Sequence, residues 1–508
     1  MRLGISIAIL DFGFWIEELG VWVNIKKTWK LAAKQTAKNL KSRLQKHPDS
    51  GLQIPWNFAQ IGVLIFPTIP ILGALGIFLG LIGTCQQKFR QITRRPLNRG
   101  FAILSVLLVI TAIFANNRIE AFLGLCNFLP FFILFAAFSR LIETPAQLRQ
   151  LSSIIAISSI PVIILGLGQQ FLGWSGIDLL QPVFGWVLEP TGNPPGRMAS
   201  VFMYANILAC YLTIAFILAL GLWMEGFRRK KEAGSSATDS VTDITDSSTS
   251  HFDYFLNFVV VGNAVCLIFT NSRNAWGLAV LASVAFAVYA GWKKLLAVVF
   301  SAVGAVFLSA FGPQPVRQYL RTIIPAFFWA RLTDEMFPNR PTATLRTTQW
   351  QFAWSMAQQR PWTGWGLRNF TPLYQDRMHE WLGHPHSLIL MLTAETGIPV
   401  TLCFLGLVGW ILARGVLLLM NWRSHFPVDI QQQEIEENAI SNITNQVICQ
   451  DVNSGDRLIF FSYLLAFAAC TLFNTVDVTL FDFRVNTISW LLLAAIWGVC
   501  EEGIGHRE

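Results

Sequence analysis

Residues 200–223 read SVFMYANILACYLTIAFILALGLW, an apolar stretch that contains no charged residue. As a helix, a stretch of this length crosses the hydrocarbon core of a bilayer, which is roughly 30 Å thick and needs about 20 residues. Comparable stretches recur along the chain. We expect spans at 56–84, 100–116, 120–138, 150–168, 200–223, 254–271, 275–291, 294–312, 386–420, 457–475 and 485–500. The sequence therefore predicts an all-α fold, a polytopic bundle of transmembrane helices.

The composition supports a membrane protein. The chain of 508 residues is 53% hydrophobic and only 13% charged, whereas roughly a quarter of the residues of a soluble domain are charged. The formal charge of +8 is carried by short basic clusters at the ends of apolar stretches and not by a folded basic domain. This placement is typical of membrane topology and argues against a nucleic-acid-binding protein.

Clusters of lysine and arginine orient the chain, because short loops rich in these residues stay in the cytoplasm. The clusters are Lys88 to Arg99, Arg140 to Arg149, Arg228 to Lys231 and Lys293 to Lys294. A single crossing by 56–84 would place the basic N-terminus outside, so we expect two short spans that meet near Pro67 and Pro70. The prediction is about twelve helices in the plasma membrane, with both termini in the cytoplasm.

This topology divides the chain into five regions. They are a basic, amphipathic cytoplasmic segment at 1–53, transmembrane helices at 54–312, an extracytoplasmic helical loop at 313–385, further transmembrane helices at 386–500 and a cytoplasmic tail at 501–508. The first region has the pattern of a helix on the inner leaflet, with a solvated basic helix as the alternative. The 313–385 loop keeps aromatic residues and a helical pattern, which is typical of a folded, functional loop.

The 313–385 loop is rich in arginine although it is expected to lie outside. It contains Arg317, Arg321, Arg331, Arg340, Arg346, Arg360, Arg368 and Arg377 against Asp334, Glu335, Asp376 and Glu380, so its net charge is eight minus four, or +4. Guanidinium groups bind phosphate oxygens through paired hydrogen bonds. The charge favours an anionic ligand at the outer membrane face, unless it only reflects that long loops escape the charge rule.

A histidine lies where this loop meets the next apolar stretch. The sequence GWGLRNF at 364–370 is followed by HPHSLILMLTAETGIPV at 384–400. Pro385, His386 and Ser387 are expected to open the apolar helix at its first turn. A histidine at that position is either a structural residue or, beside so many arginines, a catalytic one.

No metal site is indicated by the sequence. The loops contain no Asp-x-Asp pair and no His/Asp cluster along the chain that would bind magnesium or manganese. In NTVDVTLFDFR, we interpret Asp477 as a helix cap or as a partner of Arg484.

Several motifs resemble the signature of the O-antigen ligase and polymerase superfamily, membrane glycosyltransferases of GT-C type. They are Arg346 with Trp350, PWTGWGLRNF at 361–370, His386-Ser387, Gly397-Ile398-Pro399, GRMASVFMYANILA at 196–209 and TNSRNAWGLAV at 270–280. Two positions depart from the family. Val400 replaces a glycine, and Tyr204-Ala205-Asn206 stands where the family has Asn-Pro-Asn, so Asn206 is not among the expected site residues.

The resemblance implies transfer of a glycan from an undecaprenyl-pyrophosphate carrier to the hydroxyl of a lipid or glycan acceptor, at the extracytoplasmic face, without a metal or another cofactor. It implies His386 as the general base. Arg273 and Arg346 would hold the pyrophosphate, with Arg197 and Arg368 as further candidates. Ligation of a finished glycan, polymerisation of repeat units and transport of bicarbonate or another small anion remain as alternatives. The scarcity of ionisable residues inside the spans disfavours transport.

Overall fold

The structure is a computed structural model that describes residues 44–176, 185–236, 246–333, 335, 341–422 and 439–505. The predicted helix at the N-terminus and the end of the predicted tail therefore lie largely outside the described residues. Contacts divide the chain into two compact units, Met1–Gln53 and Ile54–Glu508. All regular elements in the described ranges are helices, which confirms the all-α prediction.

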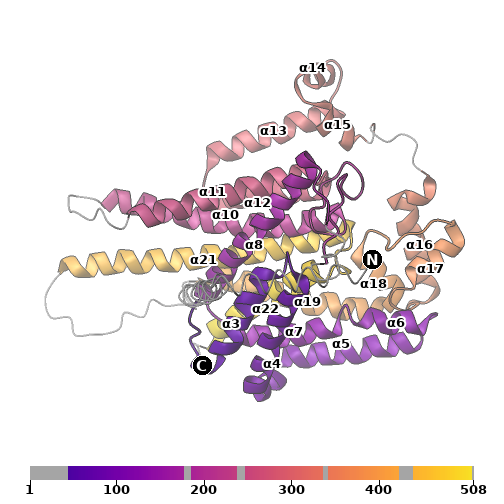
Figure 1. Cartoon of the computed structure of the whole chain (residues 1–508), viewed down its shortest axis with the longest axis horizontal. Helices are drawn as coiled ribbons and strands as arrows, with labels where there is room; N and C mark the ends of the chain where they lie inside the picture. Colours follow the sequence, from indigo (N-terminus) through magenta and orange to yellow (C-terminus); the bar gives the residue numbers. More distant parts are fainter. Residues whose placement is uncertain are drawn as a thin grey trace, which may run out of the picture. The chain divides into compact units, whose positions relative to one another are not determined.

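The helices follow the apolar stretches of the sequence (Figure 1). Their bounds are η1 (Ser50–Leu52), α3 (Gln53–Ile65), α4 (Pro70–Arg94), α5 (Pro96–Ile113), α6 (Arg118–Leu125), α7 (Leu129–Leu141), α8 (Pro145–Leu172), α10 (Ala205–Ser236), α11 (Asp246–Phe269), α12 (Arg273–Tyr289), α13 (Lys293–Phe311), α14 (Val316–Ile323), α15 (Ala326–Leu332), η2 (Thr342–Thr344), α16 (Arg346–Gln359), α17 (Phe370–Met378), α18 (Leu388–Thr396), α19 (Ile398–Met420), α21 (Ala439–Val476) and α22 (Phe483–Gly505).

Most of the expected spans are present. Within the described ranges, nine helical segments are long and apolar enough to cross a membrane, one of them formed by α6 and α7 together, and α11 and α12 contribute two shorter apolar segments. The expected break near Pro67 and Pro70 is present, because α3 ends at Ile65 and α4 begins at Pro70. The chain is thus a polytopic helical membrane protein.

One expected span is interrupted. The stretch 386–420 was predicted to be continuous, but α18 ends at Thr396 and α19 begins at Ile398. Gly397 between them has φ 82° and ψ 165°, a conformation that favours glycine. A Cβ atom at this position would lie 2.5 Å from the Trp362 carbonyl oxygen. The glycine therefore allows the break and the close approach of the preceding loop.

Helix α10 forms the centre of the bundle. It packs against α8, α11, α12 and α21, and Figure 1 shows α10, α11 and α21 side by side. Its apolar side chains are almost all buried by these neighbours. Helix α13, by contrast, contacts the bundle mainly through α12, and most of its apolar residues are exposed on the protein surface. Such a surface suits contact with lipid.

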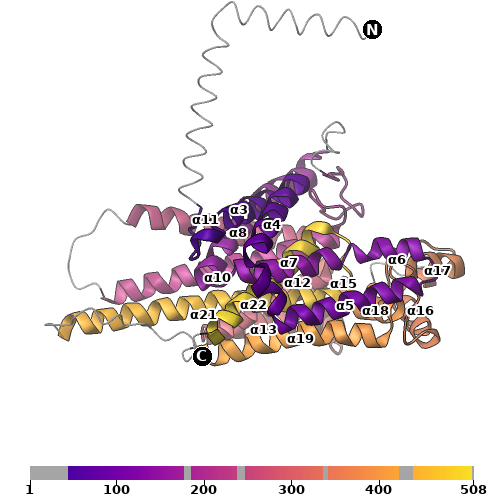
Figure 2. The same cartoon turned by 90° about the horizontal axis from the view of Figure 1, so that it is seen from below.

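The connections between spans gather in two sets. At one end, Asn116 donates its N–H to the Trp365 carbonyl over 2.9 Å, and Met198 donates to the Phe269 carbonyl over 3.0 Å. Figure 2 shows α16, α17 and α18 beside the ends of α5 and α6 at this end. At the opposite end, ion pairs join helix ends, including Arg149 with Glu225 at 2.6 Å. The candidate residues named from the sequence belong to the first end.

Candidate active site

Of the three histidines in the loop between α17 and α18, His384 and His386 lie close together. The helix begins at Leu388 with Ser387 as its N-terminal cap residue, so His386 precedes the helix and does not form its first turn. His386 has φ 51°, in the left-handed region, and its backbone N–H donates to Nδ1 of His384 over 3.1 Å. This turn brings the two imidazole rings to within 4.6 Å of each other, centre to centre.

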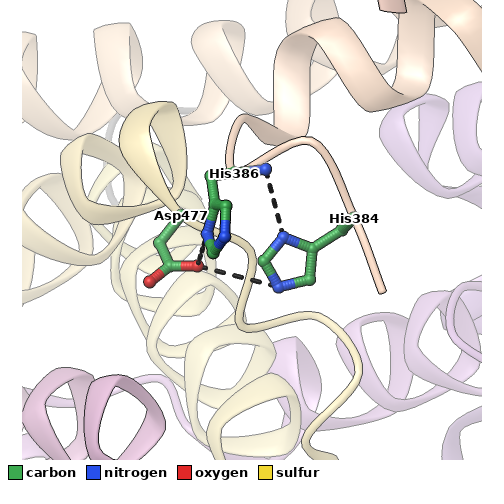
Figure 3. A group of neighbouring side chains, drawn as sticks. All are labelled: His384, His386 and Asp477. Carbon is green, nitrogen blue, oxygen red and sulfur yellow. Dashed lines mark hydrogen bonds and ion pairs between the residues drawn. The ribbon is translucent and has the colours of Figure 1, made fainter. Parts of the chain in front are cut away.

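Asp477 joins the two histidines (Figure 3). It follows the last residue of α21, and one of its carboxylate oxygens, Oδ1, lies 3.0 Å from Nδ1 of His386 and 3.7 Å from Nε2 of His384. The Val478 N–H also donates to Oδ1. The side chain of Asp477 is only 4% exposed. A carboxylate from the C-terminal part of the chain is therefore held against the histidine loop.

The interpretation of Asp477 as a partner of Arg484 was wrong. Arg484 instead donates from Nη2 to Asp482 over 3.1 Å and from Nη1 to the Val201 carbonyl over 2.9 Å. The sequence placed Asp477 and Arg484 close together, but the turn after α21 points the two side chains to different partners. Asp477 is a member of the candidate site.

The hydrogen-bond partners indicate which ring nitrogen of His384 carries the proton. Because Nδ1 of His384 accepts the His386 backbone N–H, a neutral His384 carries its proton on Nε2, facing Asp477. Burial lowers the pKa of His384 to about 4, and the charges of His386 and Arg346 act in the same direction while that of Asp477 opposes them. His384 is therefore neutral at pH 7.

Asp477 is ionised. Burial raises the pKa of its carboxyl group, but the hydrogen bond and charge of His386, the charge of His384 and the Val478 N–H outweigh burial, so that the pKa lies below its ordinary value. An ionised carboxylate can only accept hydrogen bonds. Nδ1 of His386 therefore carries a proton and donates a hydrogen bond to Asp477. The lone pair of a neutral His386 is then on Nε2, the arrangement in which a carboxylate orients a histidine as a base.

Asn206 extends the site to Arg197. Its Nδ2 donates to the second oxygen of Asp477, and its Oδ1 accepts from Nη2 of Arg197. Nε of Arg197 donates to the Thr270 carbonyl over 2.8 Å. The sequence did not include Asn206 among the site residues, but the structure places this asparagine, at the start of α10, in contact with both charged partners.

Arg346 and Arg273 begin two of the helices at this end. Arg346 is the first residue of α16, and it lies close enough to His384 for its positive charge to act together with burial in lowering the pKa of that imidazole. Arg273 is the first residue of α12. It lies three residues after Thr270, whose carbonyl accepts a hydrogen bond from Arg197. Arg197 and Arg346 thus lie beside the His–Asp group, and Arg273 begins a helix next to the contact that Arg197 makes.

Arg368 has different surroundings. Its Nε lies 3.1 Å from Glu120 at the start of α6, and both side chains are exposed. Within the described part of the chain, Arg368 has no hydrogen bond to the group formed by Asp477, Asn206 and Arg197. Its backbone has φ 62°, which helps the GWGLRNF loop to turn. The structure does not bring Arg368 together with the other candidates.

The GWGLRNF loop is fastened to α18. The N–H groups of Trp365 and Gly366 donate to the carbonyls of Ala394 and Glu395, and the buried Glu395 side chain accepts the Phe370 N–H over 3.1 Å. A Cβ atom at Gly364 would lie 2.4 Å from the backbone of Glu395. These glycines let the loop approach α18, which begins directly after the histidine loop. The motif therefore holds α18 in place, and with it the start of the helix that follows the histidine loop.

His384, His386 and Asp477 could also hold a metal ion, because their ligand atoms all lie within 4.8 Å of one another. The sequence did not reveal this cluster, because its members are distant in the chain and come together only in the folded protein. A metal on Nε2 of His384 requires the proton on Nδ1, but that nitrogen accepts a backbone N–H. The hydrogen bonds therefore fit a His–Asp pair better than a metal centre, and catalysis without a metal stays a prediction.

The spans define a class, that of polytopic helical membrane proteins, and the buried His–Asp group marks a candidate active site. Residues 258–405 match the family model described as O-antigen ligase. This match confirms the resemblance drawn from the motifs, and the chain carries the domain of the O-antigen ligase superfamily. The matched segment contains Arg273, Arg346 and His386, whereas Arg197, Asn206 and Asp477 lie outside it. No protein in a comparison with curated proteins matches the chain.

Proposed function

We propose that the protein is a glycosyltransferase that moves a glycan from an undecaprenyl-pyrophosphate carrier to an acceptor hydroxyl, with His386 as the general base. The observation that carries the proposal is the contact of 3.0 Å between Nδ1 of His386 and buried Asp477, which leaves Nε2 available as a base. The neighbouring arginines supply the positive charge that a diphosphate needs. The domain match supports the same class of substrate.

The reaction follows from these groups. Nε2 of His386 takes the proton of the acceptor hydroxyl as its oxygen attacks the anomeric carbon of the donor sugar. The bond from that carbon to the diphosphate oxygen breaks, and its electron pair stays on the diphosphate. Attack from the opposite side inverts the anomeric carbon. Arg346, Arg273 and Arg197 would neutralise the charge that develops on the leaving group.

Arg368 has a smaller part in this proposal. Its pairing with Glu120 supports a role in holding the GWGLRNF loop and not in binding the diphosphate. We therefore expect its replacement to affect the protein less than replacement of Arg346.

The proposed reaction takes place at the extracytoplasmic side of the plasma membrane. The opposite end of the bundle carries the basic clusters at Lys88 to Arg99, Arg140 to Arg149 and Lys293 to Lys294, which the charge rule assigns to the cytoplasm. The 313–385 segment and the His–Asp group would then face outward. A cysteine at Thr344 should react with an impermeant thiol reagent in intact cells, after the outer membrane, where one exists, has been permeabilised. Labelling only after lysis would contradict this orientation.

The acceptor decides between ligation and polymerisation. Addition of one finished glycan to a lipid acceptor gives a single product, whereas polymerisation gives a ladder of products that differ by one repeat unit. We propose ligation as the first choice because the matched domain is described as an O-antigen ligase. Electrophoresis of the products distinguishes the two.

Replacement of His386 tests the proposed reaction. His386→Ala should lower transfer by about 10² to 10⁴, because the acceptor hydroxyl loses its general base, while folding and binding of the carrier lipid stay nearly intact. Transfer and lipid-diphosphate binding are measured on equal amounts of purified protein. Normal transfer by His386→Ala would remove histidine from the mechanism.

A further inference from the structure

Each of the two loops that supply the His–Asp pair also carries an exposed aromatic side chain. Trp381 lies five residues before His386 and is 71% exposed, and Phe481 lies four residues after Asp477 and is 37% exposed. Exposed aromatic residues also occur on the outer faces of the helices, for example Phe300 and Trp410, but Trp381 and Phe481 belong to the two loops that carry the pair. The two exposed rings therefore belong to the loops of the pair, although they come from different parts of the chain.

Phe481 lies directly against the histidines. Its ring is nearly parallel to that of His384, with an angle of 15° between the ring planes and 6.1 Å between the centres. Because His384 is 4.6 Å from His386, Phe481 extends the surface of the catalytic group outward. Its neighbours Leu480 and Asp482 are buried, so the loop that displays Phe481 is anchored on both sides.

Trp381 is displayed by a loop that is equally well anchored. Thr371 donates its hydroxyl to the Gly383 carbonyl over 3.0 Å, and Leu382 packs against the cluster formed around Phe370 and Tyr374. The indole of Trp381 folds back over Gly383, since a Cβ atom there would lie 3.6 Å from the ring. The ring is thus held beside the residues that precede the histidine turn while its surface stays open.

Exposed tryptophan is also common where a protein meets the interface between membrane and water. Trp362 fits that setting: it is 77% exposed, and its carbonyl approaches Gly397, where the membrane-spanning helix α19 begins. Trp381 differs because it belongs to the histidine loop and precedes α18 by seven residues. The two residues therefore provide a matched pair for an experiment.

We propose that Trp381 and Phe481 form a stacking subsite for the pyranose ring that bears the acceptor hydroxyl. One face of a pyranose consists of C–H groups and packs on an aromatic ring, while its hydroxyls stay hydrogen-bonded at the rim. Such stacking would hold the ring at the edge of the group from which Nε2 of His386 removes the proton. This inference rests on the proposed transfer reaction and adds the side chains that would position its acceptor.

The experiment compares Trp381→Leu and Phe481→Leu with Trp362→Leu. Leucine keeps apolar character for contact with lipid but lacks a flat ring. Purified full-length protein in lipid vesicles receives a glycolipid extract from the membranes of the source cells as both donor and acceptor. With increasing extract, Trp381→Leu and Phe481→Leu should raise the KM roughly tenfold with little change in kcat, because stacking contributes to binding in the ground and transition states alike. Trp381→Tyr should restore most of the affinity, and Trp362→Leu should match the unaltered protein.

A second measurement separates this inference from the proposed reaction. In a His386→Ala background, binding of the oligosaccharide released from the same extract is measured at equilibrium with and without Trp381→Leu and Trp381→Tyr. Binding that weakens with leucine and recovers with tyrosine supports the subsite, whatever happens to transfer. An unchanged KM and unchanged binding in Trp381→Leu would overturn the subsite and leave the role of His386 standing, whereas full transfer by His386→Ala would overturn the reaction itself. An equal loss in Trp362→Leu would show lipid anchoring instead of sugar stacking.

Discussion

The two ends of the bundle both bury a carboxylate, but they surround it differently. At the end opposite the site, Glu225 is 5% exposed and accepts from Nε and Nη2 of Arg149, and Arg229 pairs with it at 2.7 Å. At the site end, Asp477 is 4% exposed and accepts from a histidine and an asparagine, with Arg197 one hydrogen bond further away.

This difference separates a group that ties helices together from a group that can act on a ligand. Around Glu225, the charges neutralise one another directly and join α8 to α10, and Arg149 reaches Asp456 of α21 as well. Around Asp477, by contrast, one of the hydrogen-bonding partners is a histidine, a side chain that can exchange a proton. The predictions below test whether the two buried carboxylates really differ in this way.

The largest effect is expected for Asp477→Asn. An amide at this position can donate a hydrogen bond to His386 and so favours the tautomer with its proton on Nε2, which cannot act as a base. The kcat for transfer should fall by about 10² to 10⁴, as it does when the orienting carboxylate of a catalytic triad is replaced. Asp482→Asn serves as the control, because Asp482 pairs with Arg484 outside the His–Asp pair. An equal fall in kcat in both variants would contradict a specific role for Asp477.

Glu225→Gln should affect stability and leave the reaction intact. The change leaves Arg149 and Arg229 without their shared buried partner, and breaking a buried ion pair costs roughly 3 kcal/mol in the free energy of unfolding. Denaturant unfolding of the purified protein measures the change, and transfer per folded molecule should equal that of the unaltered protein. A lower kcat with normal stability would mean that this end of the bundle is coupled to the chemistry.

Asn206→Ala should have an intermediate effect. The alanine removes one hydrogen-bond donor from Asp477 and one acceptor from Arg197, and a hydrogen bond to a charged group is worth roughly 1.5 to 3 kcal/mol. We expect a fall of about tenfold or more in kcat/KM. Asn206→Asp sharpens the test, because it pairs with Arg197 but repels Asp477. Transfer by Asn206→Asp at the normal rate would show that the link between the two charged groups is unimportant.

The smallest effect concerns stability at acidic pH. The pKa of His384 in the folded protein is about 4, below its ordinary value of 6.5, so the unfolded chain binds a proton between these pH values and the folded chain does not. Stability should therefore decrease as the pH falls from 6.5 to 4. His384→Asn keeps an oxygen that accepts the His386 N–H but cannot titrate, and its thermal midpoint should depend less on pH in this range. The same slope in both proteins would assign the pH dependence to other groups.

Membrane-spanning helices were the easiest part of this structure to predict from the sequence. Length and apolar character are local properties, and the break before Pro70 followed from charge and proline positions. The break at Gly397 was missed because Ile398-Pro399 continues the apolar pattern, and the reason for the break is a contact with Trp362. Local pattern predicts which segments cross the membrane and not where they bend.

The candidate site could be predicted only in part. His386, Arg197 and Arg346 carried recognisable motifs, but Asp477 lies 91 residues from His386 in the chain and occurs beside an arginine that offered a simpler explanation. Arg368 was named because it belongs to the signature, yet it pairs with Glu120 of a helix 248 residues away, 368 minus 120. Only the folded chain decides such partners.

The division of the His–Asp pair between two segments limits how this protein can be rebuilt. The histidine loop belongs to the matched region 258–405, but Asp477 comes from the turn after α21. Arg197 comes from the loop before α10, and Asn206 comes from the start of α10. A chimaera that exchanged only the matched region between two relatives would combine a histidine from one parent with a carboxylate from the other. Swaps that move the three segments together should keep these hydrogen bonds intact. The smallest unit that can be exchanged is therefore a set of loops at one end of the bundle and not a contiguous stretch of chain.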